Sequence, residues 1–504
     1  MGKFNVLNAI KPKLLNAEGA QAFPLSREVE LFSAVSTTFV DDTFYERKDD
    51  RMERLCGLIA QADPAFVCRL SVYARREMNL RSIPLVLLVE LLGSLRRKVT
   101  SFDRRMIGWA LNAVILRADE ISEVLAYYQL ANGRVGAKKL GALAQQLKVG
   151  VAEAFNRFDE YQFAKYDRAG SVRLRDALFL THPQAKDEAQ QALFDKIAEQ
   201  KLQVPYTWET QLSTRGNSKK VWEQLIDSGR VGYMALLRNL RNLVEAGISE
   251  EHLNRVVAIL ENRDQVRRSK QLPVRFLSAY LEVRDLEGAR PLTSALENAV
   301  GFSTSGLKFF GPQEKVLIAA DVSGSMTQAL SGKGKVLLRD VGLLLASVLR
   351  QAVGNTVTSG IFGTTWKLKN YDGKTPLRDT VALRNHANEV GTATNGFKVL
   401  EWALEQARLK YDKILFFTDC QLYDSSQDQH IQDYWKRYQK RNPSCRIYFV
   451  DLAGHGNTPL QVGEGVVQVS GFSDRVFEMI AAIERGESIV KTIQAMDWER
   501  KDDA

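Results

Sequence analysis

The sequence lacks a segment that could cross a membrane. Its strongest apolar stretch, PLVLLVELL from Pro84, is far shorter than the ~18 residues that span a bilayer, and it contains Glu90. The first residues, MGKFNVLNAIKPKLL, have neither a long apolar core nor a small-residue cleavage site. We therefore expect a cytoplasmic protein without membrane contact.

Cysteine is scarce, and a nucleotide-binding glycine loop is missing. The four cysteines, Cys56, Cys68, Cys420 and Cys445, form no CxxC pair and have no histidine at zinc-ligand spacing, so we interpret them as reduced packing residues. The stretch SGKGKVLL from Ser331 lacks the leading glycine of a P-loop. A disulfide framework, a zinc site and an ATPase are therefore not expected.

The remaining composition is globular and mildly basic. With 504 residues, 45% of them hydrophobic and 26% charged, the chain can bury two sizeable cores. The formal net charge is +9, and residues 1–300 hold 44 Lys and Arg against 37 Asp and Glu. This excess permits an anionic partner such as a nucleic acid, although a solvated surface gives the same signal.

Two patterns follow one another along the chain. From about Arg51 to Val300, apolar residues recur at spacings of three and four between short polar turns, as in RMERLCGLIAQ and EHLNRVVAILEN. This pattern predicts stacked helix pairs, although no clear sequence repeat is found. After the glycine- and serine-rich segment 301–312, short apolar strands alternate with helices, which predicts a mostly parallel sheet with helices on both faces.

Small oxygen-bearing side chains follow two of these strands. In IAADVSGSM, Asp321, Ser323 and Ser325 come at the end of one apolar run, and Asp419 ends another, ILFFTD. Ligands in such folds bind at the carboxyl ends of the strands, so the two aspartates are expected at one rim. Hydroxyl and carboxylate oxygens suit Mg²⁺ or Mn²⁺ better than zinc. The alternative for DVSGSM alone is a turn whose side chains cap backbone groups.

The pattern D-x-S-x-S, a later threonine and a later aspartate resembles the metal-ion-dependent adhesion site of von Willebrand factor A domains. The resemblance implies that Ser323, Ser325 and Thr394 hold the ion directly, while Asp321 and Asp419 act through water and hydrogen bonds. Thr394 fits the spacing to the next helix better than Thr392, and the family's aspartate after this threonine is Asn395 here. Asp424 and Asp451 also follow strands, and we expect them in solvated loops.

The helical part resembles the TROVE module of the Ro autoantigen family, in its bacterial type. The segments VGYMALLRNLRNL from Val231, LPVRFLSAYLEVR from Leu272, AKYDRAGSVRLRDALFLTHP from Ala164 and STTFVDDTFYER from Ser36 carry this resemblance, and GFSDRVFEMI from Gly471 adds to it. It implies a ring of HEAT-like helical repeats followed by a doubly wound α/β von Willebrand A domain. The implied domains are residues 1–305, residues 313–486 and a C-terminal tail, 487–504.

The same resemblance implies a scaffold for RNA quality control or decay, not an enzyme. Family members bind small structured, Y-like noncoding RNAs and the single-stranded ends of misfolded RNAs. An exoribonuclease or another acidic protein could bind through the metal site, and we expect a monomer. The candidate RNA-contacting residues are basic, and each could equally belong to a solvated helix face or a turn: Lys138, Lys139, Lys165, Arg168, Arg173, Arg175 and His182.

Four further points stay open from the sequence. The family often carries a histidine where a gap-free reading puts Leu174, so one RNA contact is expected to be missing or moved. Arg238 and Arg241 fit either an acidic partner or a neighbouring helix. The second functional hypothesis is a metal-dependent adaptor whose A domain captures an acidic partner. A nuclease ranks third, because only Asp321 and Asp419 converge.

Overall fold

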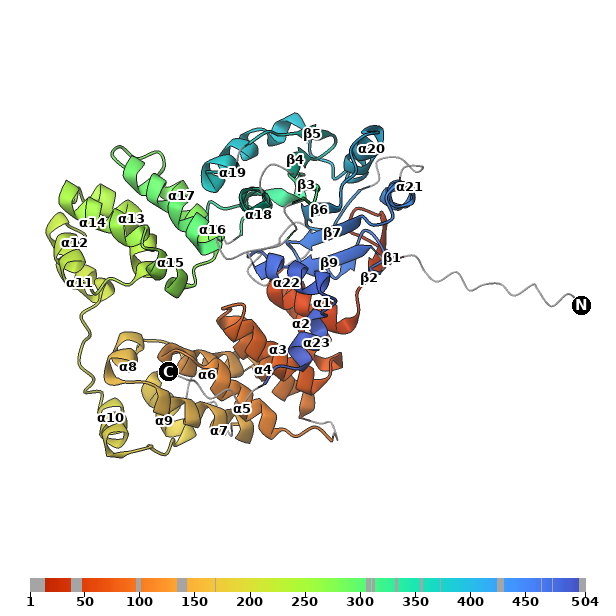
Figure 1. Ribbon diagram of the computed structural model, residues 1–504. Coiled ribbons are helices and arrows are strands. Elements are labelled where there is room, and N and C mark those ends of the chain that lie inside the picture. The colour runs from red at the N-terminus through yellow and green to blue at the C-terminus, as the bar shows by residue number, and fades with distance from the viewer. Residues whose placement is uncertain are drawn as a thin grey trace, which may run out of the picture. The chain divides into compact units, whose positions relative to one another are not determined.

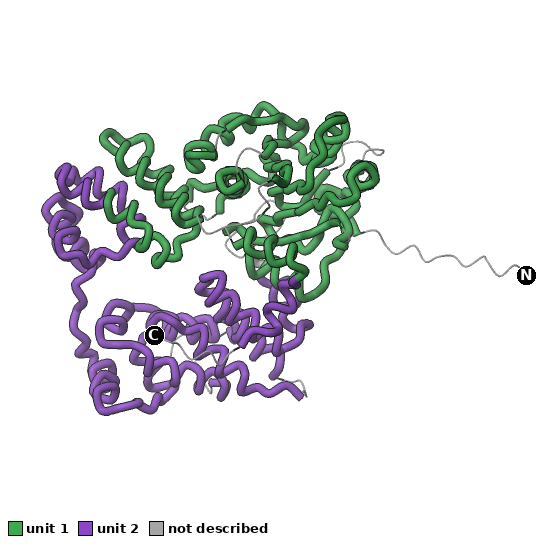
Figure 2. Tube along the Cα trace, viewed as in Figure 1, with its two compact units in different colours: residues 1–51, 257–486 green, residues 52–256, 487–504 purple. Residues whose placement is uncertain are grey.

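A computed structural model describes most of the chain and divides it into two compact units (Figure 2). One unit comprises Met1–Arg51 and Val257–Gly486, and the other comprises Met52–Val256 and Glu487–Ala504. We call them the α/β unit and the helical unit. Much of the segment 301–312 and of the STTFVDDTFYER motif lies outside the described residues, which are 14–37, 48–96, 101–133, 143–167, 169–304, 310, 313–330, 334–353, 357–371, 373–423, 430–463, 465–473 and 475–497.

The helical unit is a succession of short helices. Asp63 begins α3 by accepting the backbone N–H of Phe66, and Asp159 begins α8 in the same way with Gln162. Buried apolar side chains are nearly continuous in α4, whereas α11 has no buried residue. The helices are α2 Lys48–Gln61, α3 Pro64–Arg76, α4 Ser82–Leu95, α5 Arg105–Val114, α6 Ala118–Ala131, α7 Gln145–Ala154, α8 Glu160–Tyr166, α9 Leu174–Thr181, α10 Glu188–Ala198, α11 Trp208–Arg215, α12 Lys219–Asp227, α13 Tyr233–Glu245 and α14 Glu250–Leu260.

Alternate helices of this unit pack against one another. Helix α3 contacts α5, α4 contacts α6, and α5 contacts α7, which in turn contacts α9. Two parallel rows of helices result, as expected for stacked helix pairs. The last helix, α23 (Ile489–Gln494), belongs to the segment predicted as a tail and packs on α3. A buried ion pair between Arg75 of α3 and Glu120 of α6, 2.8 Å apart, connects the two rows.

A six-stranded sheet forms the centre of the α/β unit (Figure 1). Its strand order is β5-β4-β3-β6-β7-β9, and all neighbours are parallel except β4 and β5. The chain runs from β3 outward to β4 on one side and later to β6 on the other, so the switch point lies between β3 and β6. The strands are β3 Val316–Asp321, β4 Val357–Phe362, β5 Trp366–Leu368, β6 Lys413–Thr418, β7 Arg446–Asp451 and β9 Val466–Ser470.

Helices cover both faces of this sheet, as the sequence pattern predicts. Helices α20 (Phe397–Glu405) and α21 (Ile431–Arg441) share a buried core with one face, in which Phe416 stacks on Phe449 with ring centroids 5.3 Å apart. Helices α18 (Leu338–Val353), α22 (Arg475–Glu484) and α1 (Arg27–Ser36) pack on β3, β6 and β9. Phe417 reaches this second group, since its ring meets that of Phe477 in α22.

The beginning of the chain belongs to the α/β unit. Strands β1 (Leu14–Leu15) and β2 (Gln21–Pro24) form a hairpin, and β2 pairs with β8 (Asn457–Thr458) in a small antiparallel sheet. The hairpin also holds the segment after β6: Asn16 Nδ2 donates to the carbonyl of Leu422 at 2.6 Å, and Gln421 Oε1 accepts from the N–H of Ala17 at 2.8 Å. Residues about 400 positions apart are thereby joined.

Three helices from the region predicted as helical repeats also belong to the α/β unit. Helices α15 (Arg263–Ser269), α16 (Pro273–Val283) and α17 (Arg290–Thr304) pack on one another, and α16 and α17 contact α18 and α19 (Pro376–Asn385). Glu297 of α17 accepts the backbone N–H groups of Leu377 at 3.0 Å and Arg378 at 2.8 Å, so it caps the first turn of α19. The division into two units does not test the predicted domain boundaries, which stay a prediction.

Candidate functional site

Three loops meet at the carboxyl ends of β3 and β6. Asp321 is the last residue of β3, and Asp419 follows the last residue of β6. The two strands are parallel neighbours with Ala320 opposite Phe417, which brings Asp321 next to Thr418. Both aspartates are completely buried. The sequence therefore correctly predicted that the two carboxylates lie at one edge of the sheet.

The Asp321 carboxylate organises the first loop. Its Oδ1 accepts the N–H of Ser323 at 2.9 Å, and its Oδ2 accepts the hydroxyl of Thr418 at 2.7 Å. The hydroxyl oxygens of Ser323 and Ser325 lie 3.4 Å apart, and both serines are buried. The D-x-S-x-S segment thus directs two neutral hydroxyl groups to the space beside a carboxylate.

The threonine loop closes the same space. The N–H of Gly324 donates to the carbonyl of Thr392 at 2.9 Å, and the N–H of Tyr423 donates to the carbonyl of Thr394 at 2.9 Å. Thr394 is buried, whereas Thr392 is exposed. All three loops are therefore hydrogen-bonded to one another, with the Thr394 side chain inside and the Thr392 side chain outside.

Asn395 occupies the position after this threonine and is also buried. Its Nδ2 donates to the carbonyl of Thr364 at 2.9 Å, while its Oδ1 has no hydrogen-bond partner among the described residues. A buried amide oxygen without a donor costs free energy unless a ligand, ion or water supplies one. This orphaned oxygen fits a site that takes a further polar or charged group.

The electrostatics of the site favour a cation. Burial raises the pKa of Asp321, and the nearby Asp419 carboxylate raises it further. Burial and the neighbouring aspartates also raise the pKa of the Cys420 thiol, which keeps this side chain neutral. In the described part of the chain, no three His, Cys, Asp or Glu side chains cluster as a metal site. The available donors are therefore two carboxylates and several hydroxyls, which are hard oxygen ligands.

Asp451 corrects one expectation from the sequence. It ends β7 and is completely buried, so the prediction of a solvated loop is wrong. Its carboxylate accepts from the N–H groups of Ala453 at 3.0 Å and Gly454 at 2.7 Å and from the Ser33 hydroxyl at 3.2 Å. These donors satisfy Asp451, which ties α1 to the sheet. Asp424 lies outside the described residues.

The basic candidates fall on α8 and α9 of the helical unit or lie outside the described residues. Lys138, Lys139 and Arg168 are in the second group. Lys165, on α8, is half-buried, and its ammonium lies 5.7 Å from the ring centroid of Tyr161.

Arg173, which directly precedes α9, and Arg175, on α9, are exposed, and the Arg175 guanidinium lies 5.4 Å from the ring centroid of Phe179. Tyr161 and Phe179 are 48% and 52% exposed. The sequence analysis missed these two aromatics, although each lies four residues from its cation, the spacing that puts both on one helix face.

Two other positions in this region have structural roles. Leu174, at the position where the family often has histidine, begins α9 and is buried, so this position contributes to the core. His182 ends α9 in the left-handed conformation, with a φ of 47°, and its backbone N–H donates to Leu178 O at 2.9 Å. The backbone of His182 therefore forms the helix cap, while its exposed ring is free to contact a ligand. Arg238 and Arg241 are exposed on α13, where Arg241 pairs with Glu245 at 2.7 Å.

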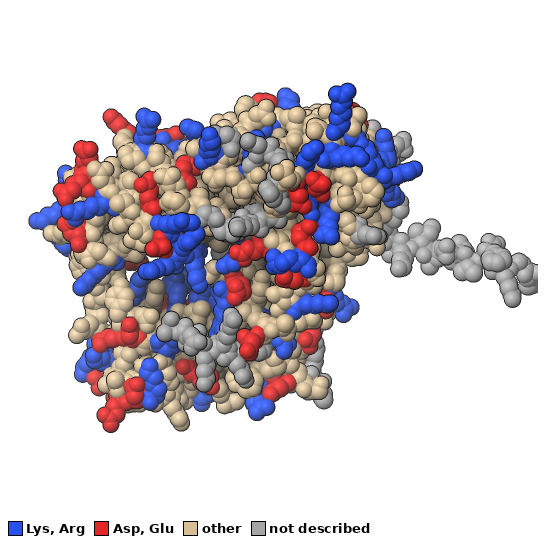
Figure 3. Space-filling view, viewed as in Figure 1, with Lys and Arg blue, Asp and Glu red and all other residues tan. Residues whose placement is uncertain are grey.

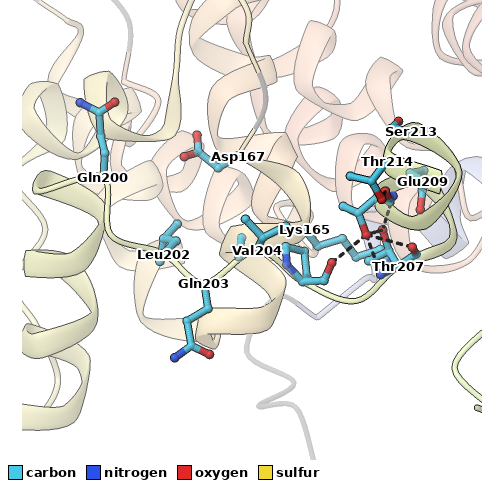
Figure 4. Close-up of a pocket in the computed structure, with 13 residues that line it drawn as sticks. Lys165, Asp167, Gln200, Leu202, Gln203, Val204, Thr207, Glu209, Ser213 and Thr214 are labelled. Carbon is cyan, nitrogen blue, oxygen red and sulfur yellow. Dashed lines mark hydrogen bonds between the residues drawn. The ribbon is translucent and has the colours of Figure 1, made fainter.

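A pocket of about 570 Å³ opens between the end of α8, the 200–207 segment and α11 (Figure 4). Lys165 and Asp167 line it from α8, and hydroxyl groups line it from α11. These hydroxyls already have partners, since Thr210 donates to Pro205 O at 2.9 Å and Thr214 donates to Thr210 O at 2.8 Å. The pocket is therefore a recess of mixed polar and apolar lining beside Lys165, in which the Thr210 and Thr214 hydroxyls are already engaged.

In the view of Figure 3, acidic and basic side chains are both present on each unit, and basic side chains gather over α20 and α21 of the α/β unit. No helix in the described part of the chain is long and apolar enough to cross a membrane. The four cysteines are free; Cys68, Cys420 and Cys445 are buried, as expected for packing residues, whereas Cys56 is partly exposed.

The fold and the sequence together define a class of proteins that joins helical repeats to a doubly wound α/β domain. The TROVE domain profile matches residues 28–200 and 198–305, which is more than half of the chain. The chain therefore belongs to the Ro family, the proteins that carry this domain.

Known relatives each match part of the chain. Telomerase protein component 1 of Rattus norvegicus is 28% identical over 316 residues, 47% of this chain and 12% of that protein. The RNA-binding protein RO60 of Caenorhabditis elegans is 27% identical over 184 residues, 34% of this chain and 27% of that protein. The chain thus spans well under a third of the length of these relatives.

A solved structure extends the likeness to nearly the whole chain. The crystal structure of the Deinococcus radiodurans RO (RSR) protein matches with a TM-score of 0.58 and 18% identity, over 92% of this chain and 100% of that one. At this identity the likeness concerns the fold. It confirms the predicted fold class of helical repeats followed by an α/β domain.

Proposed function

We propose that the protein is an RNA-binding scaffold that uses α8 and α9 of the helical unit as part of its RNA surface. Membership of the TROVE family and the likeness to a relative named as an RNA-binding protein support this proposal. The structural observation that carries it is the pairing of a cation with an exposed aromatic ring on both helices, Lys165 with Tyr161 and Arg175 with Phe179.

Such pairs suit single-stranded RNA for two physical reasons. The cations attract phosphates whatever the sequence, and this attraction weakens steeply with salt. Exposed rings offer surfaces on which unpaired bases stack, worth about 1–3 kcal/mol per base. Side chains cannot enter the deep groove of an RNA duplex, so unpaired segments and shape are the features that can be recognised. The surface thus fits structured RNAs with single-stranded ends.

The finer parts of the proposal follow from the family resemblance. The RNAs would be small, structured, Y-like noncoding RNAs and the single-stranded ends of misfolded RNAs, bound for quality control or decay. The protein would position them for a partner such as an exoribonuclease and would itself break no covalent bond. We place this activity in the cytoplasm, where free cysteines such as those of this chain stay reduced.

A salt-titrated gel shift tests the proposal. The full-length protein is mixed with a bare duplex, a duplex with a single-stranded 3′ tail and a stem-loop, with Mg²⁺ present or chelated. We expect salt-sensitive binding that is tighter with the tail and is lost in the double variant R173E/R175E. The double variant R238E/R241E, on α13, serves as the charge-matched control. Absence of binding to all three RNAs at low salt would reject the RNA proposal.

A second function, compatible with the first, is metal-dependent capture of an acidic partner by the α/β unit. The convergence of two buried carboxylates with the Ser323 and Ser325 hydroxyls supports it. Ser323, Ser325 and Thr394 would hold a Mg²⁺ or Mn²⁺ ion directly, and Asp321 and Asp419 would act through water and hydrogen bonds. The neutral hydroxyls would leave the cation with charge to accept a carboxylate from the partner.

A further inference from the structure

A second group of basic side chains lies on the α/β unit, whereas the candidate RNA surface of α8 and α9 belongs to the helical unit. Helix α21 buries Ile431, Tyr434, Trp435 and Tyr438 against the sheet core and exposes its cations on the other side. Lys436, Arg437 and Lys440 are all exposed. Because residues three and four apart share a helix face, these three charges form one row.

Arg441 joins a neighbouring loop to this row. Its guanidinium donates to the carbonyls of Leu404 at 2.7 Å, Gln406 at 2.6 Å and Ala407 at 2.8 Å. These contacts satisfy the carboxyl end of α20 and fix the 406–412 loop beside the last turn of α21. The loop adds two exposed cations, Arg408 and Lys410. We call the set formed by Arg408, Lys410, Lys436, Arg437 and Lys440 the α21 surface.

The α21 surface lies at the opposite end of the strands from the metal-type site. Figure 3 shows basic side chains gathered over α20 and α21, at the upper right of the view. The loop leads into Lys413, which begins β6, and α21 leads toward Arg446, which begins β7. The surface thus borders the amino ends of these strands, whereas Asp321 and Asp419 are at the carboxyl ends. One site can be changed without altering the other.

The chemistry of the α21 surface fits a phosphate backbone better than a protein. Protein interfaces have apolar and aromatic anchors at their centre and are depleted in lysine. Within the described residues of α21 and the 406–412 loop, Leu409 is the exposed large apolar side chain, at 38%. Acidic side chains are near the margin: Asp433 lies 3.8 Å from Lys436 at the start of α21, and Glu405 precedes the loop. A convex row of cations without an anchor matches a chain of phosphates.

We propose that the α21 surface is a second RNA-binding surface, which contacts the phosphate backbone without reading the sequence. The inference rests on the proposed RNA-binding function and extends it to the α/β unit. Binding at two surfaces raises the affinity for an RNA long enough to reach both, through the effective concentration of the second contact. A short RNA engages one surface only.

The test compares salt dependence in the full-length protein. The variant K436Q/R437Q/K440Q removes three charges, and K367Q/K374Q/R378Q removes three exposed charges elsewhere on the α/β unit as a matched control. If three phosphate contacts are lost, the slope of log K against log salt becomes shallower by about 2 and affinity for a long structured RNA falls by about tenfold or more. The control variant should keep the slope and the affinity of the wild type.

The outcomes separate this inference from the proposed function. If K436Q/R437Q/K440Q binds long RNA like the wild type while R173E/R175E does not, the α21 surface is no RNA contact and the proposed function stands. If the wild-type protein binds no RNA, both fail. If poly-glutamate binds the wild type as tightly as RNA of equal charge does, and K436Q/R437Q/K440Q loses the poly-glutamate binding but keeps the RNA binding, the surface takes acidic protein and the RNA inference is overturned. Circular dichroism of each variant checks that it is folded.

Discussion

Single side chains join parts of the fold that are distant in sequence. Glu297 is the clearest example. It belongs to α17, and its carboxylate caps α19, which begins about 80 residues further along the chain. Burial raises its pKa to about 7, and Asp379 raises it as well, while the two backbone donors and Arg378 lower it. The same carboxylate contributes to the raised pKa of Tyr280 on α16. The contact between these helices therefore depends on the charge of one residue.

Stability should fall as pH rises, because of Glu297. Its pKa is higher in the folded chain than its ordinary value of 4.5, so the folded state binds more protons between pH 4.5 and about 7. The stabilising contribution is complete below pH 4.5, is lost as pH rises to about 7, and then levels off. Urea unfolding at pH 5 and pH 8 should show this decrease in the wild type and a smaller one in E297Q. Equal pH dependence of the two proteins would contradict the assignment.

Gly363 should tolerate no side chain. A Cβ at this position would lie 2.1 Å from the carbonyl oxygen of Gly391, in the loop that leads to Thr394. The Gly363 carbonyl also accepts the N–H of Asn395 at 2.9 Å. We expect G363A to lose about 1–3 kcal/mol of stability, the usual cost of overpacking, and to displace the threonine loop. Denaturant unfolding measures the loss, and G463A, whose Cβ would meet no atom within 4 Å, is the control. Wild-type stability of G363A would contradict this prediction.

At the level of helices, α8 and α9 each carry an exposed aromatic ring four residues from a basic side chain. This arrangement predicts that the ring and the charge contribute to different kinds of binding. The ring should matter only where bases are unpaired, while the charge should matter for any RNA.

Removal of one ring tests whether the ring and the charge contribute to different kinds of RNA binding. F179A should weaken binding of a single-stranded RNA by about 1–3 kcal/mol, about five- to 150-fold, because one stacked base is lost. Binding of a bare duplex should change little. Fluorescence anisotropy with both RNAs measures the two affinities, and L130A, which truncates another exposed apolar residue of the helical unit, is the control. An equal loss for both RNAs would show that the ring acts by supporting α9 and not by stacking.

The sequence predicted most elements and both aspartates of the metal-type site, because strands that end in oxygen-bearing side chains are a local pattern. The signal is weaker for β9 and α19, because their segments VVQVS and PLRDTVALRN are short and mixed in polarity. The sequence analysis misplaced Asp451, since the Ser33 hydroxyl that contacts it lies 418 residues away. The membership of α15–α17 in the α/β unit depends likewise on tertiary packing, which periodicity does not encode.

For the whole molecule, the proposed metal site predicts a gain in stability on ion binding. A ligand that binds only the folded state adds about 2.7 kcal/mol at a hundredfold excess over Kd. Mg²⁺ or Mn²⁺ should therefore raise the Tm of the chelator-treated protein, and the double variant S323A/S325A should lose this shift. S294A, an exposed serine on α17, is the control. An equal shift in S323A/S325A would place the ion elsewhere.

The order in which the units can form follows from the hairpin at the start of the chain. During synthesis on the ribosome, the hairpin and α1 emerge first, but their partners β8, β7 and β9 come more than 400 residues later. Residues 52–256 emerge between them and can assemble most of their helical packing meanwhile. The buried side chains of α1 and the outer edge of β2 therefore lack these partners until nearly the whole chain is made. During that interval they are surfaces on which a chaperone could act.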